Sequence, residues 1–204
     1  MTFLSDTQLE ARAAAIWRAR SLRPNFDAEA LVDDVGLRLM WKVIEDSPDE
    51  HIFGALIPAR RCVVLNERHR DTLEGNLGLR RFTLGHEIGH WELHVRPTGG
   101  GQLAYIEGDR SWCRERSSNP LEIQAERFAA FLLTPTELLV PRLPPAPWGG
   151  WTPVRELAAY FGTSLTAMIV RLEKGAWAHR DANGYPRSGK PKVESPQLVL
   201  LPDE

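Results

Sequence analysis

The stretch Thr83–His94, TLGHEIGHWELH, brings three histidines and two glutamates together within twelve residues. His86, Glu87 and His90 form the pattern H-E-x-x-H. On a helix, residues four apart share a face and lie about 6 Å apart along the axis, so two imidazoles at this spacing can reach one metal ion. The glutamate between them is placed to contact a water molecule rather than to ligate. The stretch therefore predicts a helix that offers two ligands to zinc.

The alternative is an ordinary helix whose histidines and glutamates form a polar face, because H-E-x-x-H fixes only three residues. The intervening residues favour the metal. Gly85, Ile88 and Gly89 leave an apolar, close-packed helix rather than a solvated one. A helix with that surface is expected to lie in the interior, against a second element that can supply a further ligand.

Catalytic zinc usually takes three protein ligands and leaves one position open for water. His94 lies eight residues after His86, which on a continuous helix is about 12 Å along the axis. No glycine between His90 and His94 would break the helix. We therefore expect His94 to lie beside the ligands, to contact substrate, or simply to pack.

Two glutamates of a later predicted helix are the other candidates for the third ligand. Glu122 and Glu126 stand one turn apart, and the small neighbours Ala125 and Ala129 would let this helix approach the histidine helix closely. Glu122 also has a structural alternative, since it follows Asn119 by the three residues typical of a capping box. Spacing alone leaves the choice between the two glutamates open.

Composition places the chain among soluble globular proteins. It has 204 residues, 43% of them hydrophobic and 25% charged, with a net charge of −2, so there is no overall basic excess for nucleic-acid binding. The two cysteines are far apart, which fits a reducing compartment. The N-terminus lacks the apolar core of a signal peptide, and no apolar run approaches the ~20 residues that cross a bilayer. We expect a cytoplasmic protein with no membrane partner.

Hydrophobic periodicity and turn signals predict the remaining elements. Helices are expected over residues 6–20, before Gly36, and over 76–95, 119–135, 152–162 and 163–175. A strand is expected in 37–44, and a hairpin over 51–58 and 62–66. Zinc peptidases commonly align substrate along a sheet edge, so this hairpin is a candidate substrate rim. The basic cluster 68–70 beside it is expected to be solvated surface.

Leu157, Ala158 and Gly162 fit the packing and turn positions of a helix-turn-helix. The second helix of that pair, however, is rich in apolar residues and carries Arg171 and Lys174 only near its end. A helix that reads bases normally presents basic or amide side chains. The composition therefore favours packing or protein contact, and direct nucleic-acid binding is the less favoured alternative.

Three segments together resemble the ImmA/IrrE family of zinc metallopeptidases. They are RRFTLGHEIGHWELH (80–94), WCRERSSNPLEIQAERFAAFLLTP (112–135) and VRELAAYFGTSLTAMIVRLEKG (154–175). The resemblance implies that Glu122, the first residue of the family's E-x-x-A-N pattern, is the third zinc ligand beside His86 and His90. Glu126 stands where the family usually has Asn, and is expected beside the ligands, where it could orient a histidine.

The resemblance also implies a fold. We expect an α+β architecture, in which residues 1–143 form a mainly helical, zincin-like domain of the gluzincin type with a small antiparallel sheet. Residues 144–178 would form a helix-turn-helix-like pair packed on that domain. Residues 176–204 carry no signal of the family, and turn residues alone predict a turn-rich tail over 179–204.

The implied activity is that of a zinc-dependent endopeptidase. It would cleave an Xre-type helix-turn-helix repressor and so derepress a mobile-element or stress-response programme. Glu87 would take a proton from the attacking water and pass it to the leaving amine. A second group must stabilise the oxyanion, and Tyr105 ranks ahead of His94 and Arg114. The alternatives are a non-catalytic transcription regulator, or a toxin–antitoxin component, that uses the peptidase fold as a scaffold.

Overall fold

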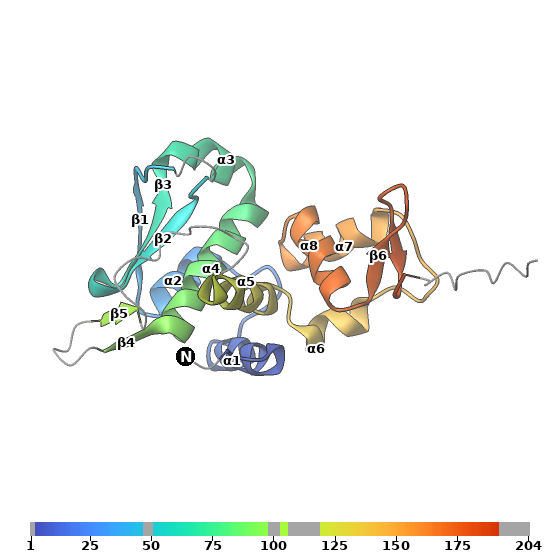
Figure 1. The fold of residues 1–204 in the computed structure, drawn as a ribbon, viewed down its shortest axis with the longest axis horizontal. Helices are drawn as coiled ribbons and strands as arrows, with labels where there is room; N and C mark the ends of the chain where they lie inside the picture. The colour runs from blue at the N-terminus through green and yellow to red at the C-terminus, as the bar shows by residue number, and fades with distance from the viewer. Residues whose placement is uncertain (1–2, 47–50, 98–102, 106–118, 192–204) are drawn as a thin grey trace, which may run out of the picture.

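The computed structural model describes residues 3–46, 51–97 and 119–191, together with the backbone of 103–105. Figure 1 shows two lobes side by side. The larger lobe contains helices α1 to α5 and a three-stranded sheet, and the smaller lobe contains α6 to α8 and a hairpin. Among the described helices, none is both long and apolar enough to cross a bilayer.

The first helix, α1 (Asp6–Ala19), begins at a capping box in which Ser5 and Gln8 satisfy each other's backbone N–H groups. Its apolar stripe packs against α5 (Pro120–Leu133), where the indole Nε1 of Trp17 donates a 2.7 Å hydrogen bond to the backbone oxygen of Leu132. The next helix, α2 (Ala28–Asp34), ends just before Gly36, whose φ of +82° suits a residue without a side chain. Both predicted helices are confirmed.

Three strands form the sheet of the larger lobe: β1 (Arg38–Lys42), β2 (Gly54–Ile57) and β3 (Cys62–Asn66). Their order is β1-β3-β2. The predicted hairpin is confirmed, since β2 and β3 pair antiparallel, with residues 58–60 between them in a 3-10 turn, η1.

The expectation of a small antiparallel sheet is correct for β2 and β3 but wrong for β1, which pairs with β3 in parallel. The sheet is mixed, within the predicted α+β class. Each connection reverses the direction of the chain, so the first and third strands run the same way. The third strand then enters between the other two and pairs with both. As a result β2 is an edge strand, and it lies against α4 (Leu77–His94), the helix that carries His86 and His90.

The centre of the larger lobe is the contact between two helices, α4 (Leu77–His94) and α5 (Pro120–Leu133). Asn76 caps α4 and Asn119 caps α5, and both predicted helices are confirmed within two residues at each end. The remaining elements of this lobe are η2 (Glu67–His69), α3 (Arg70–Gly75), β4 (Val95–Pro97) and β5 (Leu103–Tyr105).

Two small-residue positions let α4 and α5 approach closely. A Cβ atom built at Gly89 would lie 3.1 Å from both the backbone oxygen of Ala125 and the ring of Phe128. At Gly85 it would lie 3.5 Å from the Cβ of Ala129, an ordinary contact. The close approach brings the first turn of α5 beside the histidines of α4.

The smaller lobe has its own apolar cluster, which runs from Leu139 to Ala178. It consists of α6 (Thr136–Leu139), η3 (Val140–Arg142), α7 (Thr152–Phe161), α8 (Leu165–Lys174), β6 (Ala178–Arg180) and β7 (Pro186–Ser188). Helices α7 and α8 meet at Gly162, whose φ is +65°. The turn predicted at residues 183–184 lies in the β6–β7 hairpin. Ordered structure therefore continues past residue 178 to the end of this hairpin.

Candidate metal centre

His86 and His90 of α4 and Glu122 of α5 form one cluster at the contact between these helices. The two Nε2 atoms are 3.0 Å apart, and the Glu122 Oε2 atom lies 3.0 Å from Nε2 of His86. The second carboxylate oxygen, Oε1, is 3.3 Å from Nε2 of His90. Among the described residues, this is one of two groups whose potential ligand atoms all lie within 4.8 Å of one another.

These separations fit a single zinc ion. Zinc binds imidazole nitrogen and carboxylate oxygen at about 2.0–2.2 Å, so ligand atoms at the corners of a tetrahedron are about 3.4 Å apart. With Oε2 of Glu122 as the oxygen donor, the three separations are 3.0, 3.0 and 3.4 Å, which come close to that value. The set of two nitrogens and one oxygen leaves a fourth position for water or substrate, as catalytic zinc requires.

Charge in the cluster favours a cation. Burial would raise the pKa of Glu122, but its hydrogen bonds with His86 and His90 hold that pKa well below its usual range. Burial likewise lowers the pKa of His86, yet the hydrogen bond with Glu122 and the nearby Glu87 raise it above its ordinary value. An ionised carboxylate thus stands beside two imidazoles, and positive charge between these groups is stabilised.

Glu87 is buried between α4 and the edge strand β2. Its carboxylate accepts a hydrogen bond from the backbone N–H of Leu56. Strand and helix can lie this close because residue 54 is glycine: a Cβ there would be 2.7 Å from Cγ2 of Thr83 and 3.7 Å from Oε1 of Glu87. Burial raises the pKa of Glu87, and the neighbouring histidines offset only part of that effect. The carboxylate is therefore fixed and more basic than usual.

Comparison with known proteins identifies the family. The family model of the IrrE N-terminal-like peptidase domain matches residues 41–173, well over half of the chain. The chain belongs to the ImmA/IrrE family. A solved structure titled "Mycobacterium tuberculosis transcriptional regulator" is similar to this ImmA/IrrE member, with a TM-score of 0.52 and 13% identity over 95% of this chain and 69% of that one. At that identity the likeness concerns the fold alone. A search of the curated proteins found no match.

His94 lies directly behind the cluster in this ImmA/IrrE member. Its Nδ1 is 3.0 Å from Nδ1 of His90, and the residue is buried. Burial and the neighbouring His90 lower the pKa of His94 to about 3, so its ring is neutral. Sequence spacing left three positions open for His94: beside the ligands, facing substrate, or packed. The structure places its ring against His90, and its role beside a metal ligand remains a prediction.

Glu126 was expected to contact a histidine of the cluster, but its ion-pair partner is Lys174. Its carboxylate forms a 3.0 Å ion pair with Lys174 of α8, which connects the two lobes. Its proposed role in orienting a ligand histidine remains a prediction. The backbone of Tyr105 pairs with Val95 in the β4–β5 ladder, but the side chain of Tyr105 and the whole of Arg114 lie outside the described residues.

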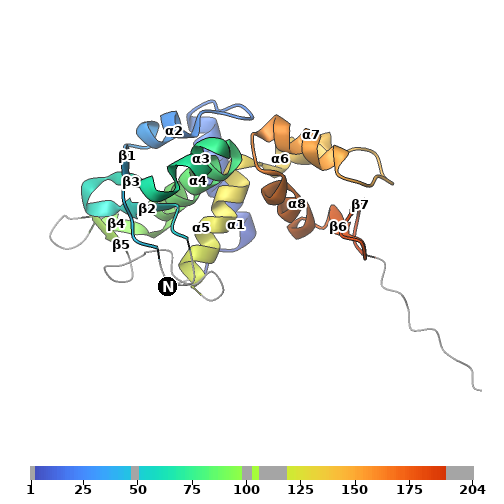
Figure 2. The same cartoon turned by 90° about the horizontal axis from the view of Figure 1, so that it is seen from above.

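A cleft of about 470 Å³ opens at the cluster, with His86, Glu87 and Glu122 in its lining. Strand β2 contributes its first residue and the preceding Phe53. Helix α8 contributes several residues, and Figure 2 shows it beside α5 across the junction of the lobes. Sequence reasoning did not predict this wall, because it depends on how the smaller lobe packs against the larger one.

Proposed function

We propose that this protein is a zinc-dependent endopeptidase in which His86, His90 and Glu122 hold the metal and Glu87 is the catalytic base. The observation that carries the proposal is the convergence of three donor atoms from two helices, at zinc-like separations, beside a buried carboxylate. Membership of a peptidase family supports the same reading. In this proposal the larger lobe is a zincin-like domain of the gluzincin type.

Zinc, when bound, would polarise a peptide carbonyl and make a water molecule acidic near neutral pH. Glu87 would accept the proton of that water and deliver it to the leaving amine. The N–H of Leu56 holds the Glu87 carboxylate, so the base need not change position between the two transfers. Tyr105 remains our candidate for the group that stabilises the oxyanion.

His94 would fix the orientation of a ligand. With Nε2 of His90 facing the metal, its Nδ1–H would donate to Nδ1 of His94, 3.0 Å away. Ligand histidines usually donate their second N–H in this way, to a carboxylate, a carbonyl or water, and the contact sets the tautomer and the ring angle. Here the neutral imidazole of His94 would accept that hydrogen bond.

The substrate would bind as an extended segment. Edge strand β2 borders the cleft, and a peptide could add to it and pass the metal. Helix α8 narrows the other side, where only Thr166 and Lys174 of that helix are exposed. A helix so covered has little surface for reading bases, so we assign α8 to the cleft wall. By family resemblance, the substrate is a regulatory protein, of which an Xre-type repressor is the first candidate.

Three variants test this function. Glu87→Gln is expected to keep the metal content of the wild type and to abolish cleavage of a co-expressed Xre-type repressor. Glu122→Gln is expected to lose one zinc per chain, whereas the matched control Glu126→Gln should retain it. Retention of zinc and activity by Glu122→Gln would refute the ligand set.

A second function deserves a direct comparison, because the similar solved structure is titled a transcriptional regulator. If the peptidase fold served only as a scaffold for regulation, alone or in a toxin–antitoxin pair, Glu87→Gln would leave the cellular response unchanged. Under the peptidase proposal, the same variant loses both cleavage and the response. Reporter expression measured with wild type and Glu87→Gln side by side decides between them.

A further inference from the structure

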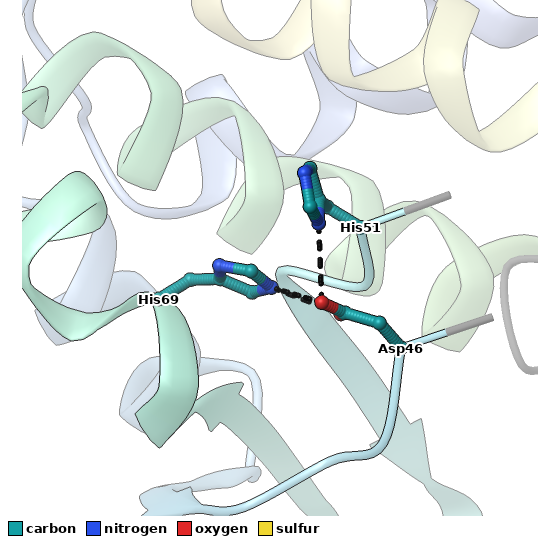
Figure 3. A group of neighbouring side chains, drawn as sticks. All are labelled: Asp46, His51 and His69. Atoms are coloured by element: carbon teal, nitrogen blue, oxygen red, sulfur yellow. Dashed lines mark hydrogen bonds and ion pairs between the residues drawn. The ribbon is translucent and has the colours of Figure 1, made fainter. Parts of the chain in front are cut away.

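A second group of potential ligands lies outside the H-E-x-x-H cluster. Figure 3 shows the imidazole rings of His51 and His69 turned towards the carboxylate of Asp46. Nε2 of His69 is 2.9 Å from each carboxylate oxygen, and Nδ1 of His51 is 3.1 Å from Oδ2. Among the described residues, these three and the cluster at His86 are the groups that could hold a metal ion.

We propose that Asp46, His51 and His69 form a second binding site for a divalent first-row transition metal, separate from the centre at His86. Two imidazoles and one carboxylate are a ligand set that such metals use with several coordination positions left open. With metal–ligand bonds of about 2.1 Å, adjacent ligands of an octahedral ion are about 3.0 Å apart. The nitrogen–oxygen separations of 2.9 and 3.1 Å match that value.

A buried polar clamp holds the cluster in place. Asn66, at the end of β3, is fully buried, and its Nδ2 donates to the backbone oxygens of Ile44 (2.9 Å) and Ile52 (2.7 Å). Its Oδ1 accepts from the backbone N–H of Ile44 at 3.0 Å. The clamp therefore joins the two chain segments that carry Asp46 and His51. Because the anchor is buried and its hydrogen bonds are satisfied, it fixes these segments without help from an ion.

Each ligand is oriented by further contacts. The Oδ1 atom of Asp46 accepts a 2.9 Å hydrogen bond from the backbone N–H of Ile52. The ring of His69 packs 5.1 Å from that of Phe53 and 4.9 Å from that of His51. Protein therefore covers the inner side of the cluster, while the side chain of His51 is 72% exposed. This geometry suits an ion with protein ligands on one side and water on the other.

The hydrogen bond of His51 with Asp46 accounts poorly for the position of His51, because the His51 side chain is exposed. An ion pair or hydrogen bond at the surface contributes about 0–1 kcal/mol, and ordering its side chains offsets part of that gain. Here an exposed histidine and a second histidine converge on one carboxylate. A bound ion would be coordinated by all three side chains at once, which explains why they converge.

The site has a consequence for the cleft, because His51 and Phe53 are part of its lining together with His86. An ion held by His51 would lie beside the segment that leads into strand β2, the proposed substrate rim. The second ion would therefore lie on the approach to the first one. Binding of the second ion at Asp46, His51 and His69 does not depend on whether the protein is a peptidase.

Metal content of the full chain tests the proposal. Each protein is stripped with a chelator, incubated with excess Zn²⁺, passed through gel filtration and analysed for zinc. We expect two zinc ions per chain in the wild type, one in His51→Ala, one in His90→Ala and none in the double variant. His179→Ala is the matched control, since that histidine contacts the Gly189 carbonyl instead, and it should retain two.

The exposed position of His51 means that His51→Ala should leave the fold intact, which the urea midpoint of the metal-free protein checks. His69→Ala gives a second, independent variant and should also bind one zinc. Equal zinc in wild type, His51→Ala and His69→Ala would overturn the proposal. Loss of zinc only in His90→Ala would support the first centre alone, and loss only in His51→Ala and His69→Ala would support the second alone.

Discussion

Gly89 sets the distance between α4 and α5, so alanine at this position tests how the candidate metal centre is assembled. The new Cβ would meet the backbone oxygen of Ala125 at 3.1 Å and its Cα at 3.2 Å. Contacts this short require the neighbour to move by a few tenths of an ångström, and here the neighbour is helix backbone. Helix α5 must therefore shift as a unit, and Glu122 lies on that helix.

Gly85→Ala is the matched control, four residues earlier on the same helix. Its Cβ would lie 3.5 Å from the nearest atom, so no shift is required. Replacing a mid-helix glycine by alanine gains about 0.5–1 kcal/mol of stability. Overpacking a close-packed core costs about 1–3 kcal/mol. We therefore expect Gly85→Ala to be more stable than wild type, and Gly89→Ala to be less stable than Gly85→Ala by about 1–3 kcal/mol.

Two measurements on the same variants check this reasoning. Urea denaturation of the metal-free proteins gives the difference in the free energy of unfolding. Competition with a chelator gives zinc affinity, which should fall in Gly89→Ala alone, because the Glu122 carboxylate would leave its 3.0 Å contact with His86. If both variants gained stability equally and bound zinc as the wild type does, the close helix contact would not determine the site.

Three further outcomes are expected. Trp17→Phe leaves a buried carbonyl of α5 without its donor and should cost about 1–3 kcal/mol in urea denaturation. Burial raises the pKa of Cys62, so in a Cys113→Ser chain alkylation should stay slow at pH 8–9 until urea unfolds the protein. Because the unfolded thiol loses its proton first, this group makes stability fall as pH rises above about 8.5. Arg171→Lys loses two ring contacts, near 5 Å each, and a 2.6 Å hydrogen bond, which should lower the urea midpoint.

Helices and the hairpin could be predicted because their signals are local. Asn76 and Asn119 cap the two long helices within three residues of the N–H groups that they bind. The parallel pairing of β1 had no such signal, since it depends on a strand that enters the sheet later in the chain. The ligands of the second cluster were missed for the same reason. Asp46 and His51 follow no metal-binding spacing, and His69 belonged to a run that resembled ordinary basic surface.

The choice between Glu122 and Glu126 shows where local reasoning ends. Both stand on one face of α5, and the capping-box spacing gave Glu122 a structural alternative. In the structure Asn119 caps the helix through the N–H of Leu121, so the Glu122 side chain is left to contact the histidines. Glu126, one turn later, reaches Lys174 instead. Which carboxylate meets the histidines depends on how far α5 is displaced along α4, and we expect the packing at Gly89 to determine that displacement. In that case a residue without a side chain would select the proposed ligand, although it contributes no donor atom of its own.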